Sequence, residues 1–312
     1  VKKIAGDKLD EKKIPMMAVS GAFVFAAQMI NFTIPGTGSS GHIGGGILLA
    51  ALLGPFPALL TLASVLLIQC LFFADGGLLA YGCNVFNMGV VACFIAYTLV
   101  YRPIVKKGIN KKRITAASVA AAVLGLQAGA FCVVLETVFS GVTELPFGTF
   151  VLLMQPIHLA IGFVEGLVTA AVLCYVHQVR PEVLESSLEN TRMAADLPMR
   201  NVIAGFVVLA LIAGGVLSIF ASSYPDGLEW SMEKTAGTAE LEREGPVYEA
   251  AGGVVEKTAF LPDYGLPGDD SGGAAGTALS GIIGSVITVI LAGGAGLVIH
   301  AVRSRPRGRE TA

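Results

Sequence analysis

The chain contains 312 residues, of which 54% are hydrophobic and only 14% are charged. Soluble proteins carry about 25% charged residues, so this composition predicts an integral membrane protein. The formal net charge of -2 gives no general attraction to nucleic acid, and no nucleic-acid partner is expected. The five cysteines lie in or beside apolar runs without CxxC spacing, which argues against a disulfide framework or a thiolate metal site.

Eight apolar segments are candidate membrane spans, because a helix needs about 20 apolar residues to cross the hydrocarbon core. The expected spans are 16–34, 43–54, 57–74, 84–101, 114–140, 147–177, 201–221 and 279–302. The segment 43–54 is short, and the chain is expected to reverse at Gly54-Pro55-Phe56-Pro57 and return through 57–74. The sequence therefore predicts an all-α polytopic membrane protein with six spans, a linker and two further spans.

Basic residues predict the orientation of these spans in the cell membrane. Lysines and arginines gather before the first span, at 102–113, at 180–200 and at 303–309. All four clusters are expected to be cytoplasmic, which places both ends of this chain in the cytoplasm.

The chain is expected to divide into two membrane domains, 1–180 and 200–312, joined by a cytoplasmic linker at 181–199. Apolar positions in the linker, Val183, Leu184, Leu188 and Leu197, suggest an amphipathic surface helix. The loop 222–278 carries 11 acidic and 3 basic residues, a balance of -8, and is expected outside with little core of its own. It is either a solvated linker, the favoured interpretation, or a surface that gathers cations.

A lone histidine interrupts the run NFTIPGTGSSGHIGGGILLA at residues 31–50. Irregular backbone at membrane depth is tolerated where protein surrounds it or where it lines a cavity, so this glycine-rich break is expected to line an outward-facing cavity. A neutral imidazole is the commonest metal ligand, which makes His42 the main candidate for one. The alternative is a hydrogen-bonded structural histidine. Gly36 and Gly41 have the spacing of a P-loop, but His42 replaces the required lysine, so no phosphate site is expected.

Further polar residues lie within or beside the expected spans, where they are costly and usually face the bundle interior. Asn31, Asp75 and His158 are less certain candidate metal ligands. Together with Asn84, Asn87 and Glu165 they suggest a polar chamber.

Small residues form a stripe on the first span. Ala18, Ala22 and Ala26 repeat every four residues beside Gly21, a pattern that allows close helix packing. The partner is either internal or another subunit.

Long motifs in the chain resemble a known family. The runs KIPMMAVSGAFVFAAQMINFTIPGTGSSGHIGGGILLAALLGPFPA, FFADGGLLAYGCNVFNMGV and HLAIGFVEGLVTA resemble the CbiM/NikM family over about residues 10–180. Members of this family are the substrate-capturing S components of energy-coupling factor transporters for cobalt and nickel. Separately, SSYPDGLEW and PDYGLPG resemble the PDGLE domain, a NikN-like small subunit.

The resemblance implies a six-helix S-component bundle that binds a divalent metal ion and is not an enzyme. His42 is then a direct ligand of Ni²⁺ or Co²⁺, with nickel favoured by the PDGLEW sequence. The stripe Ala18, Ala22 and Ala26 is implied to contact the transmembrane coupling subunit. Two separate ATPase subunits are implied to power release, so no ATP site or cofactor is expected here.

The resemblance also implies a further helix before this chain. Members begin with Met-His, whose nitrogens join the later histidine in a square around the metal, a field that suits Ni²⁺ or Cu²⁺. This chain starts at Val1, one helix late, and we expect upstream sequence to encode Met-His and an apolar helix.

Two other functions remain open at this point. A membrane-embedded enzyme would use His42, Asp75 or His158 as acid-base groups, which requires two of them to reach one substrate atom. An S component for an organic vitamin would need aromatic side chains around its cavity, whereas the outer loops offer mostly glycine, serine and other small residues.

Overall fold

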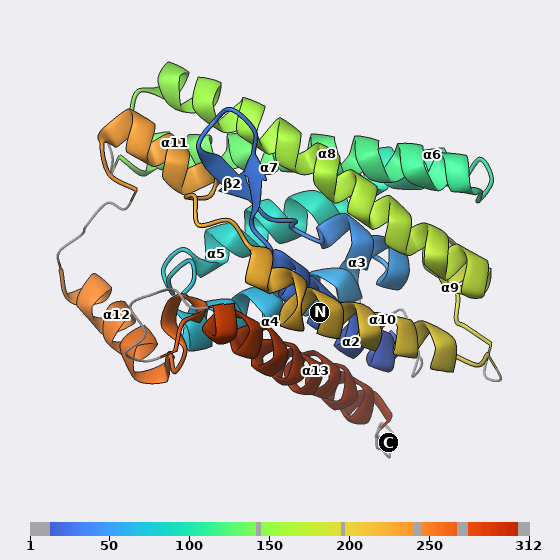
Figure 1. Ribbon diagram of the computed structural model, residues 1–312. Helices are drawn as coiled ribbons and strands as arrows, with labels where there is room; N and C mark the ends of the chain where they lie inside the picture. Colours follow the sequence, from blue (N-terminus) through green and yellow to red (C-terminus); the bar gives the residue numbers. More distant parts are fainter. Residues whose placement is uncertain (1–12, 142–144, 195–196, 240–244, 267–273, 305–312) are drawn as a thin grey trace, which may run out of the picture.

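Long apolar helices dominate the computed structural model, which describes residues 13–141, 145–194, 197–239, 245–266 and 274–304 (Figure 1). Among these residues, six helical segments are long and apolar enough to cross a membrane: Pro55–Phe73, Tyr81–Val105, Lys111–Ser140, Phe147–Val179, Arg200–Phe220 and Ala275–Ile299. The prediction of an all-α polytopic membrane protein is confirmed.

The elements follow one another in this order along the chain: α2 (Lys13–Gln28), β1 (Phe32–Ile34), β2 (Ser39–Gly41), α3 (Gly46–Leu53), α4 (Pro55–Phe73), α5 (Tyr81–Asn84), η1 (Val85–Tyr101), α6 (Arg102–Val105), α7 (Lys111–Ser140), α8 (Phe147–Val179), α9 (Pro181–Glu189), α10 (Arg200–Gly215), η2 (Leu217–Phe220), α11 (Gly227–Ala236), α12 (Pro246–Thr258), η3 (Pro262–Tyr264) and α13 (Ala274–Ser304). Several begin where the sequence provides a start signal. The Asn110 side chain accepts a hydrogen bond from the Arg113 amide ahead of α7, and prolines open α4 and α9.

The first span is shorter than the expected 16–34. Helix α2 ends at Gln28, because residues 32–34 leave the helix and pair in antiparallel register with residues 39–41. The turn between these strands contains Gly36 and Gly38 at φ of 79° and 77°, a conformation that glycine adopts without strain.

The expected short span 43–54 is a broken one. Its helical part, α3, has eight residues and is therefore about 12 Å long, well under the roughly 30 Å of the hydrocarbon core. Residues 42–45 before it belong to neither helix nor strand, and every residue of α3 is buried. After Gly54 the chain reverses directly into α4, as expected. Since Lys13 Nζ donates to the Leu53 carbonyl at 3.3 Å, α3 ends near the start of α2.

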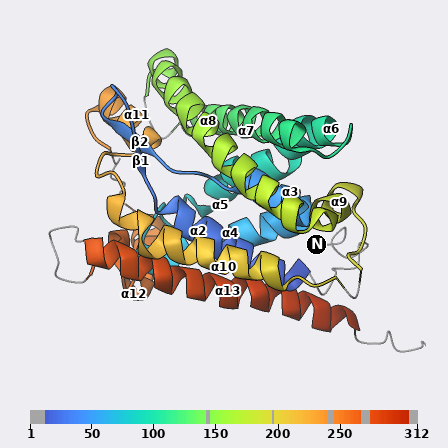
Figure 2. The ribbon, with the colours of Figure 1, turned by 45° about the vertical axis from the view of Figure 1, so that its right-hand side comes forward.

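The second membrane domain packs against the first span. Helices α10 and α13 lie along α2 (Figure 2). The alanine stripe faces this contact: Ala18, Ala22 and Ala26 are all buried, and Ser285 of α13 donates to the Ala22 carbonyl at 3.3 Å. The structure therefore gives the stripe an internal partner. All three alanines are buried within this protein, so the stripe that the resemblance assigns to a coupling subunit is not a free surface here.

The linker forms a shorter helix than the expected range 181–199. Helix α9 ends at Glu189, and its apolar face, with Val183, Leu184 and Leu188, is buried. Ser187 donates to the Ala50 carbonyl of α3, which ties the linker to the end of the broken span.

The described parts of the basic clusters share one end of the bundle, where α6, α9 and the end of α13 lie (Figure 1). The hairpin, α11 and α12 lie at the other end. Residues 1–12 and 305–312, with the remaining basic residues of these clusters, fall outside the described residues.

Helices α10 and α13 approach each other closely at two glycines, Gly214 and Gly281. A Cβ atom at Gly281 would lie 2.5 Å from the carbonyl oxygen of Gly214 and 2.7 Å from the Cα of Gly214. The backbone of α10 would have to shift to relieve this clash. We expect Gly281→Ala to lower the free energy of unfolding by about 1–3 kcal/mol through overpacking. Thermal unfolding of the detergent-solubilised protein measures this change.

Gly294→Ala is the matched control in the same helix, because a Cβ there would meet no heavy atom within 4 Å. It should leave stability unchanged or raise it slightly, since alanine favours helix over glycine. Equal stability of the two variants would contradict the packing.

Candidate metal centre

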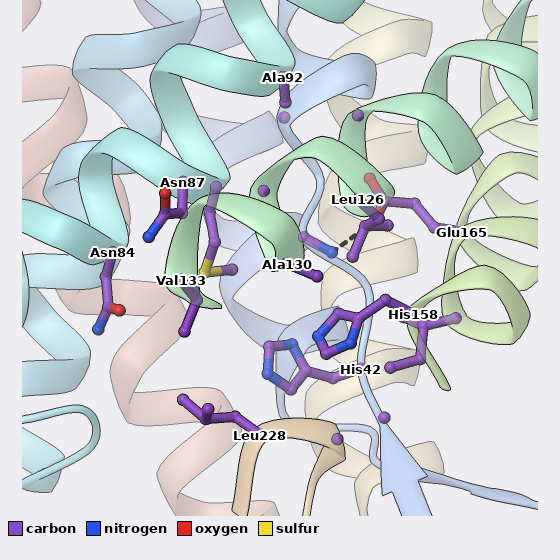
Figure 3. A pocket seen from close by; sticks show the side chains of 18 of the residues that line it. His42, Asn84, Asn87, Ala92, Leu126, Ala130, Val133, His158, Glu165 and Leu228 are labelled. Carbon is purple, nitrogen blue, oxygen red and sulfur yellow. Dashed lines mark hydrogen bonds between the residues drawn. The ribbon is translucent and has the colours of Figure 1, made fainter. Parts of the chain in front are cut away.

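A cavity of about 220 Å³ lies among the first membrane domain and the start of α11. Figure 3 shows the side chains around it. Its polar lining residues are His42, Gln69, Asp75, Asn84, Asn87, His158, Glu165 and Asp226. The rest of the lining, among the residues that the structure describes, is mainly glycine and small or aliphatic residues, without phenylalanine, tyrosine or tryptophan.

Most of the polar residues singled out from the sequence meet at this cavity. His42, Asp75 and His158 line it, as do Asn84, Asn87 and Glu165. Asn31 is absent from the lining. It lies just before β1, and its carbonyl accepts a hydrogen bond from the Ser222 amide at 2.7 Å. The chamber is therefore assembled without Asn31, because the chain leaves the helix before that residue.

The hydrogen bonds of the two cavity histidines assign their tautomers. Nδ1 of His42 lies 3.1 Å from the Ile43 carbonyl oxygen, and Nδ1 of His158 lies 2.8 Å from the Met154 carbonyl oxygen. A carbonyl oxygen only accepts, so each Nδ1 carries a proton, and in the neutral form of either ring the lone pair is then on Nε2. The two rings lie next to each other beside the cavity (Figure 3). In its neutral form each imidazole therefore offers Nε2 to a metal ion.

Glu165 holds the backbone that follows His42. One carboxylate oxygen accepts from the Gly44 amide at 2.8 Å, and the other accepts from the Gly45 amide at 3.1 Å. Glu165 is 2% exposed and comes from the middle of α8. Its two oxygens face the N-terminus of α3, where helix amides lack intrahelical partners and need acceptors.

The segment 222–228 of the second membrane domain runs along the hairpin and reaches the cavity. Ser40 donates from its amide to the Pro225 carbonyl at 2.8 Å and from its hydroxyl to the Tyr224 carbonyl at 2.7 Å. Gly227 packs on His158, where a Cβ would lie 3.1 Å from the ring carbon Cε1. The loop 222–278 is therefore more than a solvated linker, because this part of it helps to enclose the site.

Sequence reasoning missed the contribution of Asp226, Gly227 and Leu228 to the cavity lining. A local signal was present: Asp226 and Glu229 form a reciprocal capping box, which marks the start of α11. That signal predicts a helix start, but it does not predict which surface the helix covers.

A second contact from the outer loop holds Asp75. The Tyr264 hydroxyl donates to Asp75 Oδ2 at 2.5 Å, and the Tyr264 ring stacks on Phe73 with centroids 5.0 Å apart. Burial, followed by the charge of Asp75, raises the pKa of Tyr264 well above its usual value. The hydroxyl therefore stays protonated and remains a hydrogen-bond donor at neutral pH.

The arrangement suits a small, nitrogen-preferring ion better than a reaction. Two imidazoles border a cavity that also offers the Asn87 Oδ1 atom, which is buried and has no hydrogen-bond partner among the described residues. In that same part of the chain, no three or more His, Cys, Asp or Glu side chains are grouped closely enough to hold a metal ion. The described protein thus supplies a partial ligand set.

Comparison with known proteins relates both halves of the chain to metal transport. The family model "Cobalt uptake substrate-specific transmembrane region" matches residues 1–183, and the model "PDGLE domain" matches residues 200–301. A "Putative fused nickel transport protein NikMN" of Archaeoglobus fulgidus is 37% identical over 90% of this chain and 85% of its own length. A "Fused nickel transport protein NikMN" of Rhodobacter capsulatus is 31% identical over 83% of this chain and 74% of its own. A "Cobalt transport protein CbiM" of Sorangium cellulosum is 30% identical over 58% of this chain and 80% of its own.

Loss of the Tyr264 hydroxyl provides a test of the anchor at Asp75. We expect Tyr264→Phe to destabilise the protein by about 1–3 kcal/mol, because the carboxylate loses a charge-assisted hydrogen bond. The midpoint of thermal unfolding reports this loss. Tyr248→Phe in α12 is the control, since that side chain is 40% exposed and should tolerate the change. Identical midpoints for the two variants would argue against the anchor.

Proposed function

Because this chain belongs to the family of cobalt uptake substrate-specific transmembrane regions, we propose that it captures Ni²⁺ from outside the cell as the S component of an energy-coupling factor importer. The membership confirms the resemblance seen in the sequence, and the chain is a metal transport protein rather than an enzyme. The enzyme that would use His42, Asp75 and His158 as acid-base groups is therefore set aside.

The observation that carries the proposal is the position of His42. The imidazole lies on a glycine-rich break, borders the cavity and has its Nε2 lone pair free. We propose His42 as the principal metal ligand and His158 as a second nitrogen ligand. The ligands that complete the set come from water, from nearby cavity groups or from segments outside the described residues.

Nickel is preferred over cobalt on two grounds. Relatives that match 83–90% of this chain, and so reach both membrane domains, carry nickel in their names, whereas a cobalt-named relative covers 58% of it. Imidazole ligands also suit Ni²⁺, which binds a given nitrogen site more tightly than Co²⁺ in the usual order of divalent metals. A vitamin substrate fits poorly, because the described residues of the cavity lining include no phenylalanine, tyrosine or tryptophan for ring stacking.

Energy for import is proposed to come from other subunits, namely a transmembrane coupling subunit and two ATPases. The sequence supports this division of labour, since its nearest approach to a phosphate-binding loop has His42 in place of the lysine. The basic clusters favour a cytoplasmic position for α6 and α9, and the cavity then belongs to the outer half of the bundle.

Isothermal titration of the purified full chain with Ni²⁺ and Co²⁺ tests the ligand role of His42. We expect His42→Ala to weaken Ni²⁺ binding by more than the roughly 10–100-fold that loss of an outer-shell partner costs. His177→Ala is the control, because His177 lies near the other end of α8 and does not border the cavity.

Unchanged affinity of the His42→Ala protein would overturn the proposal. Tighter binding of Co²⁺ than of Ni²⁺ by the unmodified chain would instead overturn only the preference for nickel.

A further inference from the structure

The backbone that carries His42 lacks the support of regular secondary structure. Residues 42–45 lie between the end of β2 and the start of α3, and Gly45 has a φ of 76°. The helical hydrogen-bond ladder begins only where the Leu49 amide donates to the Gly45 carbonyl. Something other than helix or strand must therefore fix the direction in which His42 points.

Two buried side chains from different helices grip this backbone from opposite sides of one peptide. Glu165 of α8 accepts from the Gly44 and Gly45 amides, at 2.8 and 3.1 Å. Gln28 of α2 donates from Nε2 to the Gly44 carbonyl at 2.9 Å. Glu165 and Gln28 are 2% and 4% exposed, so neither is simply a solvated surface group.

The free-energy cost of burying Glu165 and Gln28 indicates that they are retained for their hydrogen bonds to the backbone of Gly44 and Gly45. A carboxylate within a membrane span is costly, and only strong partners offset the cost. For Gln28, Oε1 is buried with no hydrogen-bond partner among the described residues, so its bond to Gly44 is made through Nε2 alone. The fit is also close, because a Cβ at Gly45 would lie 2.6 Å from Val24.

We propose that Glu165 and Gln28 are positioning residues that fix the Gly44–Gly45 backbone and thereby aim the His42 imidazole at the metal ion. Neither residue is assigned a bond to the metal. The inference rests on the proposed role of His42 as a ligand. It further states that metal affinity depends on α8 and α2, whose Glu165 and Gln28 side chains hold the backbone of Gly44 and Gly45 just after His42.

Glu165→Gln is the main test, because it keeps the size of the side chain but turns an NH₂ group toward one of the two backbone amides. We expect the Kd for Ni²⁺ to rise about 10–100-fold, the range for loss of a partner that orients a metal ligand. Gln28→Leu removes the donor to Gly44 and should raise the Kd about 10-fold by the same mechanism.

Glu185→Gln is the control. Glu185 is an exposed residue of α9, and it neither borders the cavity nor bonds to the backbone of 42–45. The Kd of this variant should stay within about twofold of the unmodified protein, because a distant site with no shared partners is not coupled to His42.

NMR of the metal-free protein distinguishes a local change in the orientation of His42 from a global loss of structure. In protein labelled with ¹⁵N-histidine, we expect Glu165→Gln to shift the ring-nitrogen signals of His42 while those of His177 stay in place. Shifts spread over both histidines would contradict a local clamp and indicate a global change of fold.

The Ni²⁺ affinities of these variants distinguish failure of the positioning role from failure of the proposed function. If His42→Ala leaves Ni²⁺ affinity unchanged, the proposed function fails. If His42→Ala weakens binding while both Glu165→Gln and Gln28→Leu bind Ni²⁺ normally, the clamp alone is wrong. Should Glu165→Gln fail to accumulate in the membrane, Gln28→Leu decides the question, with wild-type affinity overturning the clamp.

Discussion

Backbone amides inside a membrane have no water to bond, and the irregular backbone at residues 42–45 is where this protein meets that constraint. The Glu165 carboxylate satisfies two of these amides and lies at the N-terminus of α3. The broken span can then end in a short buried helix, and the glycine-rich break can border a cavity instead of continuing as helix. The place of His42 beside that cavity follows from this one interaction.

The sequence predicted those parts of the fold that depend on local pattern. Runs of apolar residues located the long helices, and the Gly-Pro turn at residues 54–57 located the reversal between α3 and α4. The glycine-rich break was expected to line a cavity, and it does. His158 and Glu165 lie seven residues apart and therefore on nearly one face of α8, so a shared chamber was also predictable.

Contacts between distant segments were not predictable, because no local pattern encodes them. Ser40 forms hydrogen bonds with residues about 185 positions away, and no pattern in either segment predicts that the two segments meet. The alanine stripe shows the same limit: small residues indicate close packing, but they do not say that α13 is the partner. Asn31 lies outside the cavity lining for a different reason, since the helix that was expected to carry it ends at Gln28.

The contact between the hairpin and segment 222–226 joins two family domains that lie in one polypeptide. A covalent tether keeps the local concentration of that segment high at any dilution of the protein. Docking of segment 222–226 on the hairpin therefore does not depend on the concentration of the protein. Any rearrangement of this contact is a first-order process, so its rate is independent of expression level.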